Sequence, residues 1–174
     1  FRWENKGDEK QDTQLFWLDF LENVLNIANA TQQIEFEKKV GLKNTSFIDA
    51  YLKETKVLIE QKSKEIDLNK PQKQSDGSFL TPFEQAHRYN AALPFNERAR
   101  FIIICNFKEF HIYDFNLNNP LKQKPQVFYL KELPKHFDHF SFLIHKNQNI
   151  FEKEKSGKPA DHIIHDLLEL KKIL

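Results

Sequence analysis

Two acidic residues and one lysine stand out because each lies inside an apolar run. Asp49 lies in the first run, and Glu60 and Lys62, two positions apart, lie in the second. Side chains of a β-strand alternate between its faces, so Glu60 and Lys62 are expected on one face and Gln61 on the other. Carboxylates are ligands that Mg²⁺ prefers, and a lysine can orient or deprotonate water and offset phosphate charge. This residue set therefore predicts metal-dependent phosphodiester hydrolysis, with a surface ion pair on an edge strand as the alternative.

A second set of polar residues lies on a well-marked helix. Thr81 is the expected N-cap, Pro82 the first helical residue, and Glu84 completes a capping box. Gln85 and Tyr89 are four residues apart and share a face, with Arg88 beside them. An amide, a phenol and a guanidinium can hydrogen-bond to phosphate oxygens or base edges, although this spacing alone is weakly specific.

The order of the elements predicts an α/β fold, with a mixed sheet flanked by helices. Three successive strands are expected at 35–42, 46–53 and 56–63, followed by a loop at 64–78. The apolar pattern predicts helices at 13–26, 82–93 and 136–145, and further strands at 99–106, 109–115 and 126–130. A solvated linker at 152–158 and an amphipathic helix at 159–174 complete the pattern.

Composition indicates a single packed domain without a strong overall charge. The chain has 174 residues, 17 of them Phe, and a net charge of +1, so the core should be rich in Phe and any DNA contact should be local. The single cysteine, Cys105, lies in an apolar run and is interpreted as a buried hydrophobe in a reducing interior. No apolar stretch approaches the roughly 20 residues that span a bilayer, and no signal pattern is present, so a cytoplasmic protein is expected. The absence of Met and the abrupt ends suggest a fragment of a longer chain.

Other kinds of site find little support. His136 with His139, and His162 with His165, are spaced three apart on helical segments but have no third ligand nearby in sequence, so zinc is not expected. With four Gly residues, a phosphate-cradling loop is not expected. The Asn-Pro-Pro-aromatic motif of methyltransferases does not occur, and this chain is not expected to bind S-adenosylmethionine.

Taken together, the motifs resemble those of the PD-(D/E)XK nuclease superfamily. Along nearly the whole chain they are similar to the N-terminal region of MmeI-like bifunctional restriction-modification enzymes. The segments that carry this resemblance are 6–17, 47–49, 54–63, 80–89, 105–107 and 110–114. One position departs from the superfamily pattern, since Ile48 rather than Pro precedes Asp49.

The resemblance implies a restriction-endonuclease-like fold for residues 1–150 and the start of a helical spacer at 151–174. It implies that Asp49 and Glu60 are metal ligands, with the Gln61 backbone carbonyl as a candidate third, and that Lys62 is the catalytic lysine. Mg²⁺ would be the cofactor, with Mn²⁺ as a substitute. Glu9 matches an acidic position at the start of the first helix and is a candidate ligand, although a helix-capping role is favoured.

The resemblance also implies the partners. Double-stranded DNA would be the substrate in phage defence, and adenine methyltransferase and target-recognition domains would follow on the same chain. Lys64 and Arg88 are expected to add phosphate contacts near Lys62. The rival interpretation is a catalytically inactive nuclease-fold module that binds DNA or docks the methyltransferase. A purely structural domain would leave the Glu60 and Lys62 face unexplained, and the intact set of Asp49, Glu60 and Lys62 favours an endonuclease.

Overall fold

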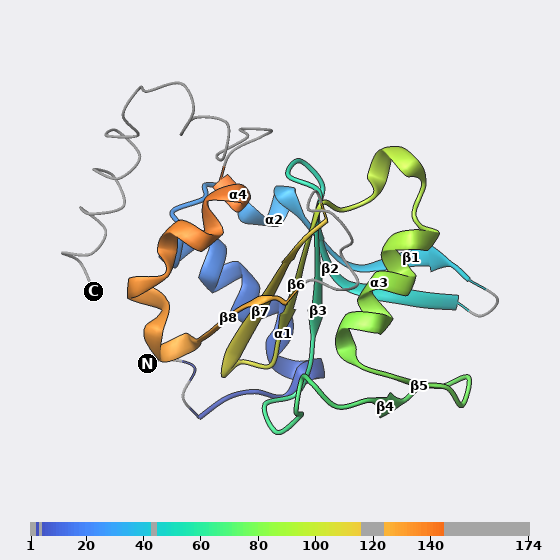
Figure 1. Ribbon diagram of the computed structural model, residues 1–174. Coiled ribbons are helices and arrows are strands. Elements are labelled where there is room, and N and C mark those ends of the chain that lie inside the picture. Colours follow the sequence, from blue (N-terminus) through green and yellow to red (C-terminus); the bar gives the residue numbers. More distant parts are fainter. Residues whose placement is uncertain (1–2, 4, 43–44, 116–123, 145–174) are drawn as a thin grey trace.

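The computed structural model describes residues 3, 5–42, 45–115 and 124–144. Within them the protein is built on a six-stranded mixed sheet with the strand order β1-β2-β3-β6-β7-β8 (Figure 1). The strands are β1 Ile34–Gly41, β2 Thr45–Leu52, β3 Val57–Gln61, β6 Phe101–Cys105, β7 Glu109–Asp114 and β8 Gln126–Tyr129. The predicted antiparallel meander of β1, β2 and β3 is confirmed, and the parallel pairing of β3 with β6 makes the sheet mixed.

A helical crossover joins the parallel strands β3 and β6, as parallel pairing requires. It contains α3 (Pro82–Ala92), whose capping box is present as predicted: the Thr81 hydroxyl accepts from the Glu84 N–H, and the Glu84 carboxylate accepts from the Thr81 N–H. The segment predicted as a loop at 64–78 is not entirely irregular. Its β4 (Gln72–Lys73) pairs with β5 (Phe79–Leu80) in a small separate sheet.

The first helix begins earlier than its apolar pattern predicts. The helix α1 spans Glu9–Asp19 and continues as the π-helix η1, Phe20–Val24, before the short α2, Ala30–Gln33. Its N-cap is Asp8, whose carboxylate accepts from the N–H groups of Lys10 and Gln11. The first turn is polar and faces solvent, so apolar spacing alone did not locate the start of the helix.

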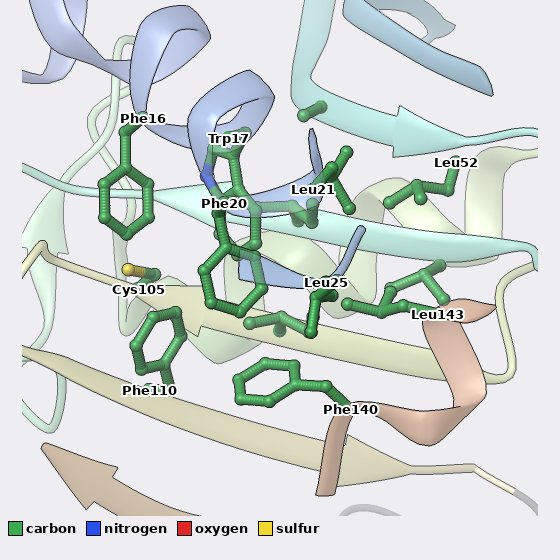
Figure 2. Packing of buried hydrophobic residues seen from close by; sticks show 14 of the residues in the cluster. Phe16, Trp17, Phe20, Leu21, Leu25, Leu52, Cys105, Phe110, Phe140 and Leu143 are labelled. Atoms are coloured by element: carbon green, nitrogen blue, oxygen red, sulfur yellow. The ribbon is translucent and has the colours of Figure 1, made fainter. Parts of the chain in front are cut away.

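Aromatic side chains fill the core between the sheet and α1. Figure 2 shows Phe16 and Trp17 of α1 and Phe20 of η1 packed toward Phe110 of β7 and Phe140. The core is therefore rich in Phe, as predicted from composition. The helices η4 (Leu130–Lys135), η5 (Phe137–Phe140) and α4 (Ser141–Ile144) lie on the same face of the sheet (Figure 1).

The prediction of a single helix at 136–145 is wrong in type over its first half. Residues 137–140 form a 3₁₀-helix, in which positions three apart eclipse, and this places both Phe137 and Phe140 in the core. His145, the predicted linker and helix at 152–174 and the whole spacer predicted at 151–174 lie outside the described residues. None of the helices in the described part of the chain is long and apolar enough to cross a membrane.

The opposite face of the sheet is covered by α3 (Figure 1). Leu58 of β3 and Ile102 and Ile104 of β6 pack there against Ala86 and Tyr89 of α3. The two cores separate the side chains of β3 cleanly. Val57 and Ile59 belong to the core beneath α1, whereas Leu58 belongs to the core beneath α3.

Candidate active site

The carboxyl end of β3 brings Glu60 and Lys62 to the α3 side of the sheet, as strand alternation predicts. The side chain of Gln61 points to the α1 side, where it meets Trp17. β3 is an internal strand, and the side chain of Glu60 is 0% exposed and that of Lys62 8% exposed. The alternative of a surface ion pair on an edge strand is therefore wrong.

Asp49 reaches this end of β3 because β2 and β3 separate there. The two strands pair from Leu52 with Val57 to Ala50 with Ile59, and the carboxylate of Asp49 then accepts the Gln61 N–H at 2.7 Å. The side chain thus replaces a backbone acceptor where the ladder ends. The N–H and C=O of one strand residue leave from the same edge, so the Gln61 carbonyl also lies on the side of Asp49.

A buried ion pair joins the two residues of β3. Lys62 Nζ donates to Glu60 Oε1 at 2.5 Å, and the Lys62 backbone N–H is fixed by the Cys105 carbonyl of β6 at 2.8 Å. The second carboxylate oxygen, Glu60 Oε2, is buried and has no hydrogen-bond partner among the described residues. A buried carboxyl oxygen without a partner is costly, so this atom is available to bind a cation.

The electrostatics of the site reflect burial and crowding of like charges. Burial, followed by the nearby charge of Asp49, raises the pKa of Glu60 to about 8. Burial also raises the pKa of Asp49 to about 6, against the opposing effect of Lys62. For Lys62, burial lowers the pKa, but the carboxylates of Glu60, Asp49 and Glu9 together raise it above its ordinary value. Two carboxyl groups with raised pKa values beside a lysine that stays protonated are typical of a functional site.

The start of α1 docks directly onto the residues that follow Lys62. The Lys64 N–H donates to the Gly7 carbonyl at 2.9 Å, and the Glu9 N–H donates to the Ser63 hydroxyl at 3.3 Å. This contact brings Glu9 Oε1 to 3.8 Å from Lys62 Nζ. Glu9 is therefore adjacent to the site, although its side chain is 36% exposed and touches the lysine rather than the other carboxylates.

Trp17 is a site neighbour that was not predicted from the sequence. Its indole N–H donates to Gln61 Oε1 at 2.9 Å, and Gln61 Nε2 donates to the Lys62 carbonyl at 3.1 Å. Both side chains are fully buried, so the network fixes the backbone between Glu60 and Lys62. A buried indole N–H needs an acceptor, but the sequence does not identify a partner 44 residues away.

The four predicted positioning residues are placed unequally. Gln85 donates to the Tyr89 hydroxyl at 3.2 Å, on the helix that packs against the Glu60 side of the sheet. Arg88 instead forms an ion pair with Asp76 of the β4–β5 turn at 2.9 Å, not with Glu60. Lys64 lines a cleft of about 420 Å³ with Gly7, Asp8 and Ser63, next to the start of α1.

The oxygen atoms of the site suit a hard cation that takes few of its ligands from the protein. Within the described ranges, no group of three or more His, Cys, Asp or Glu side chains is arranged to hold a metal ion. The described site offers instead two carboxylates, Asp49 and Glu60, and the Gln61 backbone carbonyl. Mg²⁺ commonly takes one or two carboxylates and completes its shell with water and phosphate.

The histidine pairs lie apart from this donor set. His136 stacks on Phe128 with ring centroids 4.9 Å apart, and His162 and His165 lie outside the described residues.

Comparison with known proteins identifies the family of the chain. No significant match was found among curated proteins or among solved structures. A family model described as "MmeI, N-terminal domain" matches residues 1–162, which is most of the chain and includes every residue of the site. This coverage places the chain in the context of a restriction-modification enzyme, and the protein belongs to the family of MmeI N-terminal domains.

Proposed function

We propose that this chain is the endonuclease module of a restriction-modification enzyme with the PD-(D/E)XK fold, and that it hydrolyses phosphodiester bonds of double-stranded DNA with Mg²⁺. The observation that carries the proposal is Glu60 Oε2, which has no hydrogen-bond partner in the described part of the chain and is held beside Asp49 and Lys62 at the end of an internal strand. Asp49, Glu60 and the Gln61 carbonyl would hold the ion. When bound, the ion supplies Lewis-acid polarisation of the phosphate and lowers the pKa of water.

Lys62 and Asp49 have different roles beside the ion. Lys62 keeps its proton because three carboxylates raise its pKa, so it is better suited to orient the attacking water and stabilise phosphate charge than to abstract a proton. Asp49 fixes the Gln61 backbone through its hydrogen bond to the N–H. Cleavage would leave 3′-hydroxyl and 5′-phosphate ends, as the family resemblance implies.

Gln85 and Tyr89 would position the DNA strand rather than bind the ion. An amide and a phenol are poor Mg²⁺ ligands beside carboxylates but hydrogen-bond well to phosphate oxygens. Their mutual hydrogen bond fixes both groups on α3. Base recognition would belong to the target-recognition domain of the full-length enzyme, and the linked methyltransferase would act independently of Glu60.

The test is cleavage of plasmid DNA by the full-length protein with Mg²⁺. Asp49→Asn, Glu60→Gln and Lys62→Met should each lower the cutting rate by at least a hundredfold while methylation continues. Matched controls are Glu22→Gln and Lys70→Met, both at exposed positions outside the site. Retained cutting by Glu60→Gln would refute the proposal. A wild-type protein that binds DNA but never cuts would support the inactive-module alternative.

A further inference from the structure

A second pocket, on the α1 side of the sheet, lies at the end where β3 leads into Lys62 and Lys64, and metal chemistry does not explain it. It has a volume of about 320 Å³ and an apolar lining with three lysines, formed by Trp3, Phe107, Tyr129, Leu130, Lys64, Lys108 and Lys131. The N-terminal segment, the β6–β7 turn and the start of η4 enclose it. The β6–β7 turn lies at the same end of the sheet as the carboxyl end of β3 and the start of α1 (Figure 1). We refer to these seven residues as the aromatic pocket.

The floor of the aromatic pocket is fixed before any ligand arrives. Phe107 has a backbone φ of 66°, which a non-glycine residue adopts at an energetic cost, and it is 1% exposed. Its ring packs edge-on against Phe16 at 5.1 Å between centroids. Trp3 is held by a 2.6 Å hydrogen bond from its indole to Asp19 and by an edge contact with the same Phe16. A rigid floor loses little entropy on binding.

The rim of the aromatic pocket combines one exposed ring, that of Tyr129, with positive charge. Tyr129 is 49% exposed, and Lys131 Nζ lies 5.5 Å from the centre of its ring. Lys6 Nζ lies 5.0 Å from the ring of Trp3. Lys108 also lies on the rim, in an exposed ion pair with Glu65 that exchanges easily for a phosphate. Rings beside ammonium groups are the features by which proteins bind single-stranded nucleic acid.

Lys64 connects the aromatic pocket with the candidate active site. It lines both the pocket and the cleft at the start of α1, and it follows Lys62 by two residues. Two residues span at most about 7 Å, so a DNA strand that reached from Lys62 around the end of the sheet to the pocket would meet Lys64. In an intact duplex both faces of a base are stacked, so only an unpaired or extruded base can place a face on these rings.

We propose that the aromatic pocket receives an unpaired base of the DNA strand next to the bond that is cut, with the neighbouring phosphates held by Lys64, Lys108 and Lys131. The proposal rests on the proposed nuclease function, because DNA is the ligand of the adjoining site. Stacking is tolerant of base identity, so the pocket distinguishes strand structure rather than sequence. A duplex with a single-stranded end, or one that frays, is the preferred ligand.

The experiment measures binding without cutting, using the full-length protein in EDTA. The probes are a blunt duplex and the same duplex with a short single-stranded end that carries 2-aminopurine. The wild-type protein should bind the second probe about tenfold more tightly and quench its fluorescence as the base stacks on a ring. Tyr129→Ala should lose both effects, whereas Tyr129→Phe should keep them. Lys131→Gln should weaken binding severalfold and keep the quench.

Two controls and the cutting assay separate this inference from the proposed function. Val127→Ala, at a 50% exposed position of the same strand, and Lys135→Gln, at an exposed position nearby, should change neither readout. Equal affinity for both probes, or an unchanged quench in Tyr129→Ala, overturns the inference even if Mg²⁺-dependent cutting is present. That result is also expected if another part of the chain fills the pocket. A quench that depends on Tyr129 in a protein that never cuts refutes the nuclease while supporting the pocket.

Discussion

The carboxylate of Asp49 carries a charge that folding makes costly. Burial raises its pKa from 3.8 to about 6, so the folded protein binds a proton more readily than the unfolded chain between these values. The stability contribution of this group therefore falls as pH rises through that window, and the cost is complete above pH 6. A cation that binds the deprotonated form recovers this loss, which couples metal affinity to pH.

Asp49→Asn keeps an acceptor for the Gln61 N–H and removes the charge. We expect the variant to be more stable than the wild type at pH 8 in EDTA by about 1–3 kcal/mol, with the difference vanishing near pH 4. Urea unfolding at the two pH values measures this. Excess Mg²⁺ should stabilise the wild type and not the variant. The exposed substitution Asp138→Asn should show neither effect, and a variant that gains equal stability from Mg²⁺ would remove Asp49 from the metal site.

Trp17 acts on the site through Gln61. Trp17→Phe keeps a ring in the core but leaves the buried Gln61 Oε1 without its donor, which should cost about 1–3 kcal/mol of unfolding free energy. Adding Gln61→Leu removes the stranded acceptor and should recover part of that loss. Urea unfolding of the four proteins of the cycle measures the coupling. Additive effects of the two substitutions would show that the hydrogen bond does not hold this backbone.

At the residue scale, the sequence predicts which side chains share a face of one strand. Glu60 and Lys62 follow from two-residue periodicity, and their burial in an internal strand was the part left open. Contacts between segments distant in sequence were not predictable. The Trp17 contact with Gln61 and the docking of Gly7 on Lys64 join residues 44 and 57 positions apart, and no local pattern encodes them.

At the scale of elements, the helices and strands with strong local signals were located best. The capping box fixed the start of α3, and the apolar runs located β2, β3, β6 and β7 to within about two residues. The β4–β5 hairpin has two-residue strands and no apolar run, so it was missed. The 3₁₀-helix η5 was predicted as part of a longer helix because both helix types repeat apolar residues at a spacing of three, and η4 was not predicted.

Gly7 links two elements at the site and tolerates no side chain. Its φ is +148°, and a Cβ there would lie 2.5 Å from the Cβ of Lys64. Gly7→Ala should therefore lower the unfolding free energy by about 1–3 kcal/mol and displace the start of α1 from Ser63. Cutting by the full-length protein should fall with it, because Glu9 and Lys62 lose their alignment.

Gly41→Ala is the matched control for that experiment. Gly41 has an ordinary φ and no atom within 4 Å of a Cβ at that position, so the substitution should be nearly neutral. Thermal unfolding and cutting rates of both variants decide the matter. Equal behaviour of Gly7→Ala and Gly41→Ala would show that the contact between Gly7 and Lys64 does not position the site.

For the molecule as a whole, charge is distributed rather than concentrated. The chain carries a net charge of +1, so DNA must be attracted by local groups of lysines. The lysines of the aromatic pocket, Lys64, Lys108 and Lys131, form such a group at the end of the sheet that holds Glu60. Composition predicts only that any DNA contact is local, and the place of this lysine group depends on packing between the N-terminal segment and the β6–β7 turn.

We expect these 174 residues to bind unrelated duplexes with similar, weak affinity, since base readout is assigned to another domain. With a few phosphate contacts, the slope of log K against log salt should be about −2 to −4, because each contact contributes about −0.9. Fluorescence anisotropy across a salt series measures the slope. Lys64→Gln should reduce its magnitude by about 1 for every duplex, whereas the 77% exposed Lys70, changed to Gln, should leave it unchanged. Tight binding to one sequence would instead place base recognition within this chain, since phosphate contacts alone carry no sequence information.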